Sequence, residues 1–159
     1  MPENQQAQAV QYIGLPEHGI DGKRRCVLPQ AWLPADWETK TVRLYLLVWR
    51  ETEGAPFCLM AMPEERWQRF IAPIVNAPLM DAANRKRRTW ISGNTEVVTV
   101  DANARITIPQ RLADRACIGK KAILVGQIDH FLIYDSERYT PSEGSGSEDP
   151  ALAFNTHPG

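Results

Sequence analysis

Two stretches of the chain repeat the same chemically active residues at the same spacing. An aspartate, an arginine, a proline and a glutamine occupy matching positions in residues 21–30 and 101–110, which lie 80 residues apart. An arginine on a tight turn can donate two hydrogen bonds to a phosphate or to the edge of a guanine. An aspartate at the start of such a turn accepts hydrogen bonds from backbone N–H groups and fixes the loop. The two motifs therefore indicate binding to phosphates or base edges at two equivalent turns.

Basic residues cluster at the first motif, as Lys23-Arg24-Arg25, and again in the Arg-Lys-Arg-Arg run at residues 85–88. The whole chain has 18 Lys and Arg against 19 Asp and Glu, and this net charge of −1 alone argues against a nucleic-acid partner. The first eleven and the last 20 residues, however, contain four of the acids and none of the bases. Residues 12–138 therefore carry a net charge of +3, which suits a polyanionic partner.

The elements that position these motifs repeat as well. Two apolar runs, at residues 57–62 and 131–134, each lead to a Glu-Arg pair followed by an aromatic residue. In each half the pattern predicts a strand, the tight turn of the motif, a short strand, a helix that opens at a proline, and a hairpin. Strands are expected at 26–28, 41–50, 57–62, 95–100, 106–108, 121–127 and 131–134. Helices are expected from Pro29, from Pro63 until an end or kink at Pro73, and at 109–117 with Gly119 as a left-handed cap.

The predicted organisation is a first unit at residues 12–75, a connector at 76–93, a second unit at 94–139 and a disordered acidic tail at 140–159. The tail is rich in Ser, Gly and Pro and contains no base. A unit of about 50 residues seldom buries enough core alone, so the two units are expected to share one core. The predicted fold class is α+β, mostly β.

Residues suited to catalysis or metal binding do not occur at the required spacings. Cys26, Cys58 and Cys117 are odd in number and far apart, so we expect small buried apolar side chains rather than disulfides or a metal site. The histidines lack metal-ligand spacing, and no nucleophile elbow, phosphate-binding loop or dinucleotide fingerprint occurs. We therefore expect no enzyme, no cofactor, no metal and no small-molecule substrate.

Nothing in the sequence predicts a membrane protein. No apolar run reaches the roughly 18 residues that a bilayer-spanning helix needs, and the N-terminal segment has neither the basic nor the apolar part of a secretory signal. The expected location is the cytoplasm.

A longer series of residues surrounds the two motifs in a characteristic order. Tyr12-Ile-Gly14 precedes the first motif, and the second half contains Gly93, Asp-x-x-x-Arg-Ile-x-Ile-Pro at 101–109, Leu-Val-Gly-Gln at 124–127 and Phe-x-Ile-Tyr at 131–134. The Leu-Val-Gly-Gln run before a Phe-containing strand is the most specific part. Over residues 12–139 the chain resembles the MraZ family.

The resemblance implies two AbrB-like swapped-hairpin units fused in one chain, which form one pseudo-twofold domain with disordered termini. It also implies a bacterial transcriptional regulator, chiefly a repressor, that forms a ring of identical subunits and is associated with the nucleoid. Such a protein binds short direct repeats in double-stranded DNA upstream of its own cell-division and cell-wall gene cluster. By the resemblance, Asp21 and Asp101 organise the loops, and the DNA-facing bases are Lys23, Arg24, Arg25, Arg105, Arg87 and Arg88, the last two adding phosphate contacts on the same face.

Both turns depart from the Asp-x-Lys-Gly-Arg pattern of the family. Arg24 replaces glycine in the first turn, and Asn103 and Ala104 replace lysine and glycine in the second. A non-glycine residue with a positive φ costs roughly 1–2 kcal/mol. We therefore expect Gly22 and Asn103 at the left-handed positions instead.

Other interpretations start from the same residues. Residues 110–123 resemble the first part of a helix-turn-helix, but residues 120–127, which would form its recognition helix, favour a strand. An antitoxin of the AbrB type usually has one such unit, whereas this chain has two. The alternative function that stays open is an oligomeric scaffold or protein-interaction module that kept the fold without binding DNA. The alternative for Arg25 and Arg105 is a structural ion pair with an acid of the other half.

Overall fold

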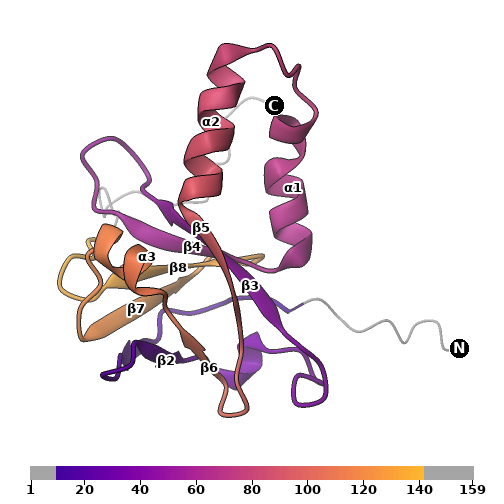
Figure 1. Cartoon of the computed structure of the whole chain (residues 1–159). Helices are drawn as coiled ribbons and strands as arrows, with labels where there is room; N and C mark the ends of the chain where they lie inside the picture. Colours follow the sequence, from indigo (N-terminus) through magenta and orange to yellow (C-terminus); the bar gives the residue numbers. More distant parts are fainter. Residues whose placement is uncertain (1–9, 142–159) are drawn as a thin grey trace, which may run out of the picture.

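The computed structural model describes residues 10–141 and has mixed α and β structure in which strands predominate (Figure 1). Its strands are β1 (Glu17–Gly19), β2 (Arg25–Val27), β3 (Arg43–Trp49), β4 (Cys58–Met62), β5 (Thr95–Thr99), β6 (Arg105–Thr107), β7 (Lys121–Gly126) and β8 (Phe131–Asp135). Its helices are the 3₁₀ turn η2 (Gln30–Trp32), α1 (Glu64–Val75), α2 (Ala82–Gly93) and α3 (Gln110–Arg115). Within residues 10–141 no helix is long and apolar enough to cross a membrane. Most of the predicted acidic tail, residues 142–159, lies outside the described residues.

Six strands form one antiparallel sheet in the order β1-β7-β8-β4-β3-β5. Corresponding strands of the two halves are β1 and β5, β3 and β7, and β4 and β8. The strand order therefore reads the same from both edges once each strand is exchanged for its counterpart. The first strand of each half pairs with the hairpin of the other half: β1 pairs with β7, and β5 pairs with β3. This exchange joins the two halves in one sheet.

The centre of the sheet preserves the same symmetry. There β4 pairs with β8, and Met60 lies opposite Leu132. Met60 and Leu132 stand at the same distance in sequence from the repeated Glu-Arg-aromatic motif, which begins at Glu65 in the first half and at Glu137 in the second. The two residues therefore occupy equivalent positions of the repeat. The repeat seen in the sequence is thus a repeat of structural positions.

The remaining strands, β2 and β6, pair with each other as a separate two-stranded ribbon. Cys26 and Ile106 lie opposite each other on its inner face and are fully buried. The same core contains the rings of Tyr12, Trp32 and Phe131, whose centroids lie 4.9–5.4 Å apart. Residues of both halves therefore share one core, as expected for units of this size.

The Leu-Val-Gly-Gln run ends β7 at Gly126, where the first described residues of the chain run alongside. The N–H of Gly126 donates to the carbonyl of Gly14 at 2.9 Å, and the N–H of Tyr12 donates to the carbonyl of Ile128 at 2.8 Å. A Cβ at residue 126 would overlap the backbone carbonyl of Tyr12. Glycine is required here because two backbones approach closely.

Helices α1 and α2 form a hairpin that projects from one end of the sheet (Figure 1). The ring of Trp67 stacks on Tyr45 of β3 with centroids 4.7 Å apart. Of the end or kink predicted at Pro73, the end is wrong, because α1 continues to Val75. Packing of its apolar stripe on the sheet outweighs one missing backbone hydrogen bond. Helix α2 lies in the stretch predicted as a connector, and the Asp81 carboxylate caps its N-terminus.

The two halves differ in their other helices. Pro29 opens only the 3₁₀ turn η2, since Pro34 follows at once and prevents a longer helix. Within residues 10–141 the second half has no counterpart of α1, because a turn at 136–138 follows β8. The helix-turn-helix alternative is excluded, since the segment that would form its recognition helix is strand β7, as expected.

The cap of α3 lies at Cys117 rather than at the predicted Gly119. The N–H of Ile118 donates to the carbonyl of Ala113 at 2.9 Å, and that of Cys117 to Asp114 at 3.2 Å. These two bonds require a left-handed residue immediately after the helix, and Cys117 has a φ of 57°. The helix ends too early for Gly119 to take this role. Cys26 and Cys58 are buried as predicted, but Cys117 is exposed.

Replacing Cys117 by glycine is expected to stabilise the protein. Glycine adopts a positive φ without the steric cost of a side chain, so Cys117→Gly should raise the free energy of unfolding by about 0.5–1 kcal/mol. Cys117→Ala keeps the strained backbone and serves as the control. Urea denaturation of both variants measures the difference. A glycine variant no more stable than the alanine variant would contradict this account of the cap.

Candidate nucleic-acid interface

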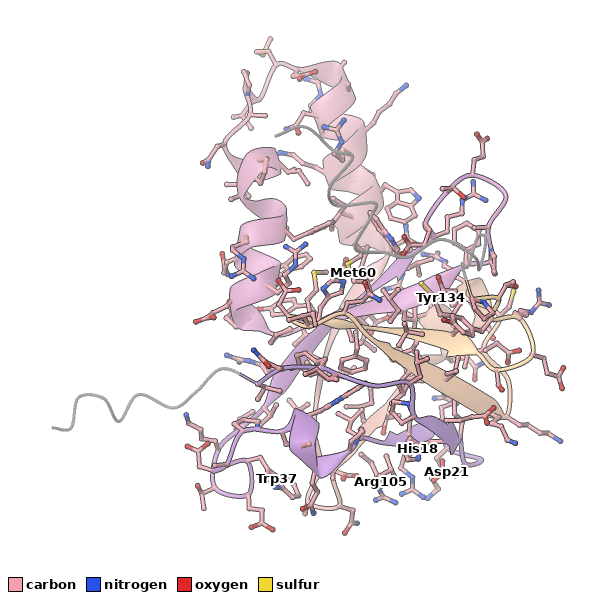
Figure 2. The ribbon with its side chains drawn as sticks, turned by 180° about the vertical axis from the view of Figure 1, so that it is seen from behind. His18, Asp21, Trp37, Met60, Arg105 and Tyr134 are labelled. Carbon is pink, nitrogen blue, oxygen red and sulfur yellow. The ribbon has the colours of Figure 1, made fainter. Side chains whose placement is uncertain are left out.

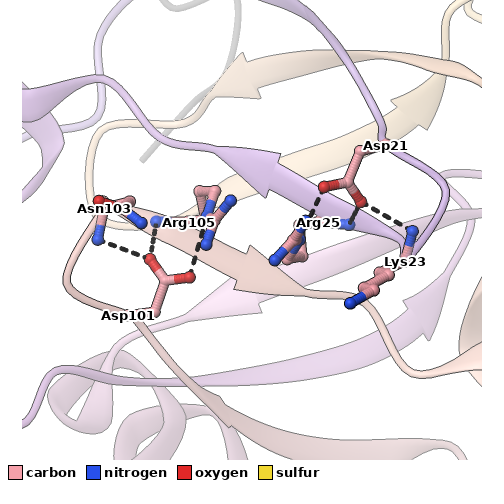
Figure 3. A network of polar contacts seen from close by, with 6 residues as sticks. All are labelled: Asp21, Lys23, Arg25, Asp101, Asn103 and Arg105. Carbon is pink, nitrogen blue, oxygen red and sulfur yellow. Dashed lines mark hydrogen bonds and ion pairs between the residues drawn. The ribbon is translucent and has the colours of Figure 1, made fainter.

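The turn before β2 is closed by the side chain of Asp21. Its Oδ1 accepts hydrogen bonds from the backbone N–H groups of Lys23 and Arg25, each at 2.9 Å. Its Oδ2 accepts a hydrogen bond from Nε of Arg25 at 2.6 Å, which forms an ion pair. One carboxylate therefore fixes both the loop backbone and the direction of the Arg25 side chain (Figure 3).

The turn before β6 has the same geometry. Oδ1 of Asp101 accepts hydrogen bonds from the N–H groups of Asn103 at 2.8 Å and Arg105 at 3.0 Å. Its Oδ2 accepts a hydrogen bond from Nε of Arg105 at 2.9 Å (Figure 3). Each arginine thus pairs with the aspartate of its own turn. Among the residues that the structure describes, neither arginine forms the ion pair with an acid of the other half that was considered from the sequence.

Both turns place a residue with a Cβ in the left-handed region. Arg24 and Ala104 each have a φ of 63°, at the positions where the family pattern has glycine. The prediction that Gly22 and Asn103 would take these positions is wrong. The residue before each motif arginine must turn the chain back so that the arginine N–H reaches the aspartate carboxylate.

The carbonyls of the two left-handed residues bind the opposite half of the chain. The N–H of Ile108 donates to the carbonyl of Arg24 at 2.9 Å, and the N–H of Leu28 donates to the carbonyl of Ala104 at 2.8 Å. These bonds extend the ladder of β2 and β6 at both ends. They offset the strain of the positive φ angles, which is roughly 1–2 kcal/mol at each residue.

Hydrogen bonding also sets the ionisation of the two carboxyl groups. The backbone N–H of Arg25 is the largest influence that lowers the pKa of Asp21, from its ordinary 3.8 to about 2. At Asp101 burial raises the pKa, but the N–H groups and the guanidinium that bind it lower the pKa further. Both carboxylates are therefore charged at neutral pH, and each keeps its arginine in place.

The outer face of the ribbon carries both motif arginines. In the antiparallel register Arg25 lies opposite Thr107, and Val27 lies opposite Arg105. The side chains of Arg25 and Arg105 are 31% and 24% exposed, so each is partly open to solvent. Within residues 10–141 the side-chain hydrogen bonds of both guanidiniums use Nε, which leaves the Nη edges for an external ligand.

Figure 2 places Asp21 and Arg105 together at the end of the molecule away from the helical hairpin. Lys23 is exposed on the same turn as Asp21. Arg24 has a structural contact, because its Nε donates to the carbonyl of Ile108 at 2.9 Å and its Nη1 to Oε1 of Gln110 at 3.0 Å. Sequence reasoning gave Gln110 no role, although glutamine recurs in both motifs.

The basic run of α2 is not part of this surface. Arg87 is exposed on α2, which projects from the opposite end of the molecule from β2 and β6 (Figure 1). The Nη2 of Arg88 donates to the carbonyls of Ile74 and Val75, at 3.3 and 3.2 Å, at the end of α1. The expectation that the run adds contacts on the face of the turns is wrong for one chain, because residues 82–93 fold as a projecting helix.

Asp21→Asn is expected to destabilise the fold in a pH-dependent way. Because the folded pKa of Asp21 is below its ordinary value, its charge stabilises the native state above about pH 3.8, and this contribution is lost as the pH falls through about 2. The urea midpoint of the variant should lie below that of the wild type at pH 6, and the gap should narrow between pH 4 and pH 2. Asp36→Asn, which removes an exposed ion pair with Lys40, is the control and should change the midpoint little. An equal gap at pH 6 and pH 3 would show that the Asp21 charge is not the cause.

Comparison with known proteins identifies the family. The family model for the MraZ protein, described as antitoxin-like, matches residues 91–150. The Transcriptional regulator MraZ of Acidithiobacillus ferrooxidans is 30% identical over 131 residues, which cover 80% of this chain and 85% of that protein. The proteins of the same name from Thioalkalivibrio sulfidiphilus and Roseiflexus sp. are each 28% identical, over 82% and 80% of this chain and 84% and 83% of their own lengths. The chain belongs to the MraZ family.

Proposed function

We propose that this chain is a sequence-specific DNA-binding transcription regulator, a repressor that binds short direct repeats upstream of its own cell-division and cell-wall gene cluster. Its relatives carry the name transcriptional regulator. A cytoplasmic, nucleoid-associated location follows from this role.

One observation supports the DNA-binding role most strongly. Two equivalent turns end in arginines whose Nε atoms are held by aspartates, and the ribbon that joins them presents both guanidiniums on one face. A guanidinium oriented in this way can donate two hydrogen bonds from its Nη edge to a guanine or a phosphate. In this proposal Lys23 adds a phosphate contact, and Asp21 and Asp101 hold the loops.

We also propose that the fold consists of two AbrB-like swapped-hairpin units, at residues 12–75 and 94–139, with residues 76–93 as the connector. The exchange of β1 and β5 between the halves supports this assignment. The proposed assembly is a ring of identical chains. Its support is the exposure of apolar residues on the helical hairpin, which include Leu79 (68% exposed) and Met80 (84%).

A gel-shift experiment with the DNA upstream of the gene tests the function directly. Binding should weaken linearly in a plot of log affinity against log salt, with a slope of about −0.9 for each phosphate contact. Arg25→Ala should reduce the affinity at least tenfold and make the slope shallower if the arginine contacts a phosphate.

Arg87→Ala is the matched control for Arg25→Ala. It removes the same charge from the opposite end of the molecule, so its effect on affinity should be smaller. Equal losses in the two variants would place the α2 surface within the DNA-binding site. Unchanged binding in Arg25→Ala would move the site away from the first turn.

The assembly has its own test. The double variant Leu79→Asp, Met80→Asp should elute from a sizing column with light-scattering detection as a smaller species than the wild type, because charges would be buried in the contact. Leu15→Asp, which changes an exposed leucine outside the hairpin, should leave the mass unchanged. A wild-type chain that is a monomer at micromolar concentration would contradict the ring.

The same exposed apolar residues favour a second candidate, an oligomeric scaffold or protein-interaction module. In that case the wild type would assemble normally but would not bind its upstream DNA even at low salt.

A further inference from the structure

We propose that the outer face of the β2–β6 ribbon recognises thymine methyl groups in the major groove, through Val27 and the methyl group of Thr107. This inference rests on the proposed DNA-binding function and names the feature of DNA that lies between the two arginines.

The ribbon exposes the apolar side chain of Val27 on its outer face, where an apolar residue is not needed for packing. Side chains alternate along each strand, so Cys26 and Ile106 point into the core while their neighbours point outward. Val27 is 43% exposed, and Thr107 is also exposed. Because β2 and β6 pair only with each other within residues 10–141, no third strand flanks these positions.

The four outward side chains form a diagonal pattern of charge and methyl groups. Val27 lies opposite Arg105, and Thr107 lies opposite Arg25. Each methyl-bearing side chain therefore has a guanidinium across the strand and another along its own strand. This apolar area is too small and too strongly charged at its edges for a protein–protein contact, whose centre is usually depleted of charge. It fits a polyanion that carries isolated apolar groups.

Double-stranded DNA has that chemistry in its major groove. The groove is about 12 Å wide and admits a two-stranded ribbon, whose strands lie about 4.8 Å apart. The thymine C5-methyl is the apolar group on the base-pair edges there, and valine or threonine methyls can pack against it. With the arginines on guanines or phosphates on either side, Val27 and Thr107 come to lie over the base edges between them.

The experiment compares thymine with uracil, which pairs identically but lacks the methyl group. Duplexes are first enriched from a random-sequence pool with the wild-type chain and then synthesised with thymidine or with deoxyuridine throughout. The wild type should bind the thymine form about fourfold more tightly for each methyl group that it contacts. Val27→Ala should lose about this factor on the thymine form, bind the uracil form as the wild type does, and keep only the part of the preference that Thr107 contributes. Thr107→Ser, which removes only the methyl group, should also reduce the preference.

Val97→Ala is the matched control, since Val97 is 50% exposed on β5, outside the ribbon. It should keep the wild-type preference for thymine. If Val27→Ala and Thr107→Ser also keep that preference while Arg25→Ala loses affinity, the DNA-binding function stands and the methyl contact is overturned. If the wild type enriches no duplex above the starting pool, the proposed function and this inference both fail.

Discussion

The antiparallel pairing of β2 with β6 is the interaction on which the arrangement of the two turns depends. Each strand has only three residues and comes from a different half of the chain, so neither would be stable as an isolated strand. Pairing gives both strands a hydrogen-bonding partner and buries Cys26 against Ile106. It also places Arg25 and Arg105 on the same face, although they are 80 positions apart in the sequence. The register of the short β2–β6 ladder therefore sets the distance between the two arginines.

The same pairing explains why strained residues are tolerated in the turns. A positive φ at Arg24 would be costly in an isolated loop, but two independent contacts determine it here. The carboxylate of Asp21 binds the N–H groups on either side of Arg24, and the N–H of Ile108 binds its carbonyl. The Arg24 side chain adds bonds to the other half. Strain that the rest of the structure determines in this way is typical of functional sites.

The sequence repeat carried most of the information about the fold, and its failures have physical causes. The equivalent offsets of Asp, Arg, Pro and Gln located both turns and the short strands that follow them. The left-handed positions do not follow from the local sequence, because the cost of a Cβ at Arg24 is offset by hydrogen bonds exchanged with Ile108, 84 residues away. Helix α2 is not predictable from apolar periodicity, because only Asn84 and Ile91 of its residues are buried. The face of the ribbon that points outward is determined by the pairing between the two halves. Local sequence patterns carry no information about this pairing.

The two halves of this chain can differ in sequence, whereas the two subunits of a homodimer cannot. The first turn carries Lys23, Arg24 and Arg25, whereas the second retains only Arg105 beside Asn103 and Ala104. The backbone of the ribbon is therefore symmetric, but its positive charge is concentrated at one end. In the proposed complex a duplex lying along the ribbon meets a stronger positive potential at the first turn than at the second. The two orientations of the chain on DNA then differ in energy. Chains that each take the favoured orientation match sites repeated in the same direction, which is the arrangement of direct repeats rather than of inverted ones.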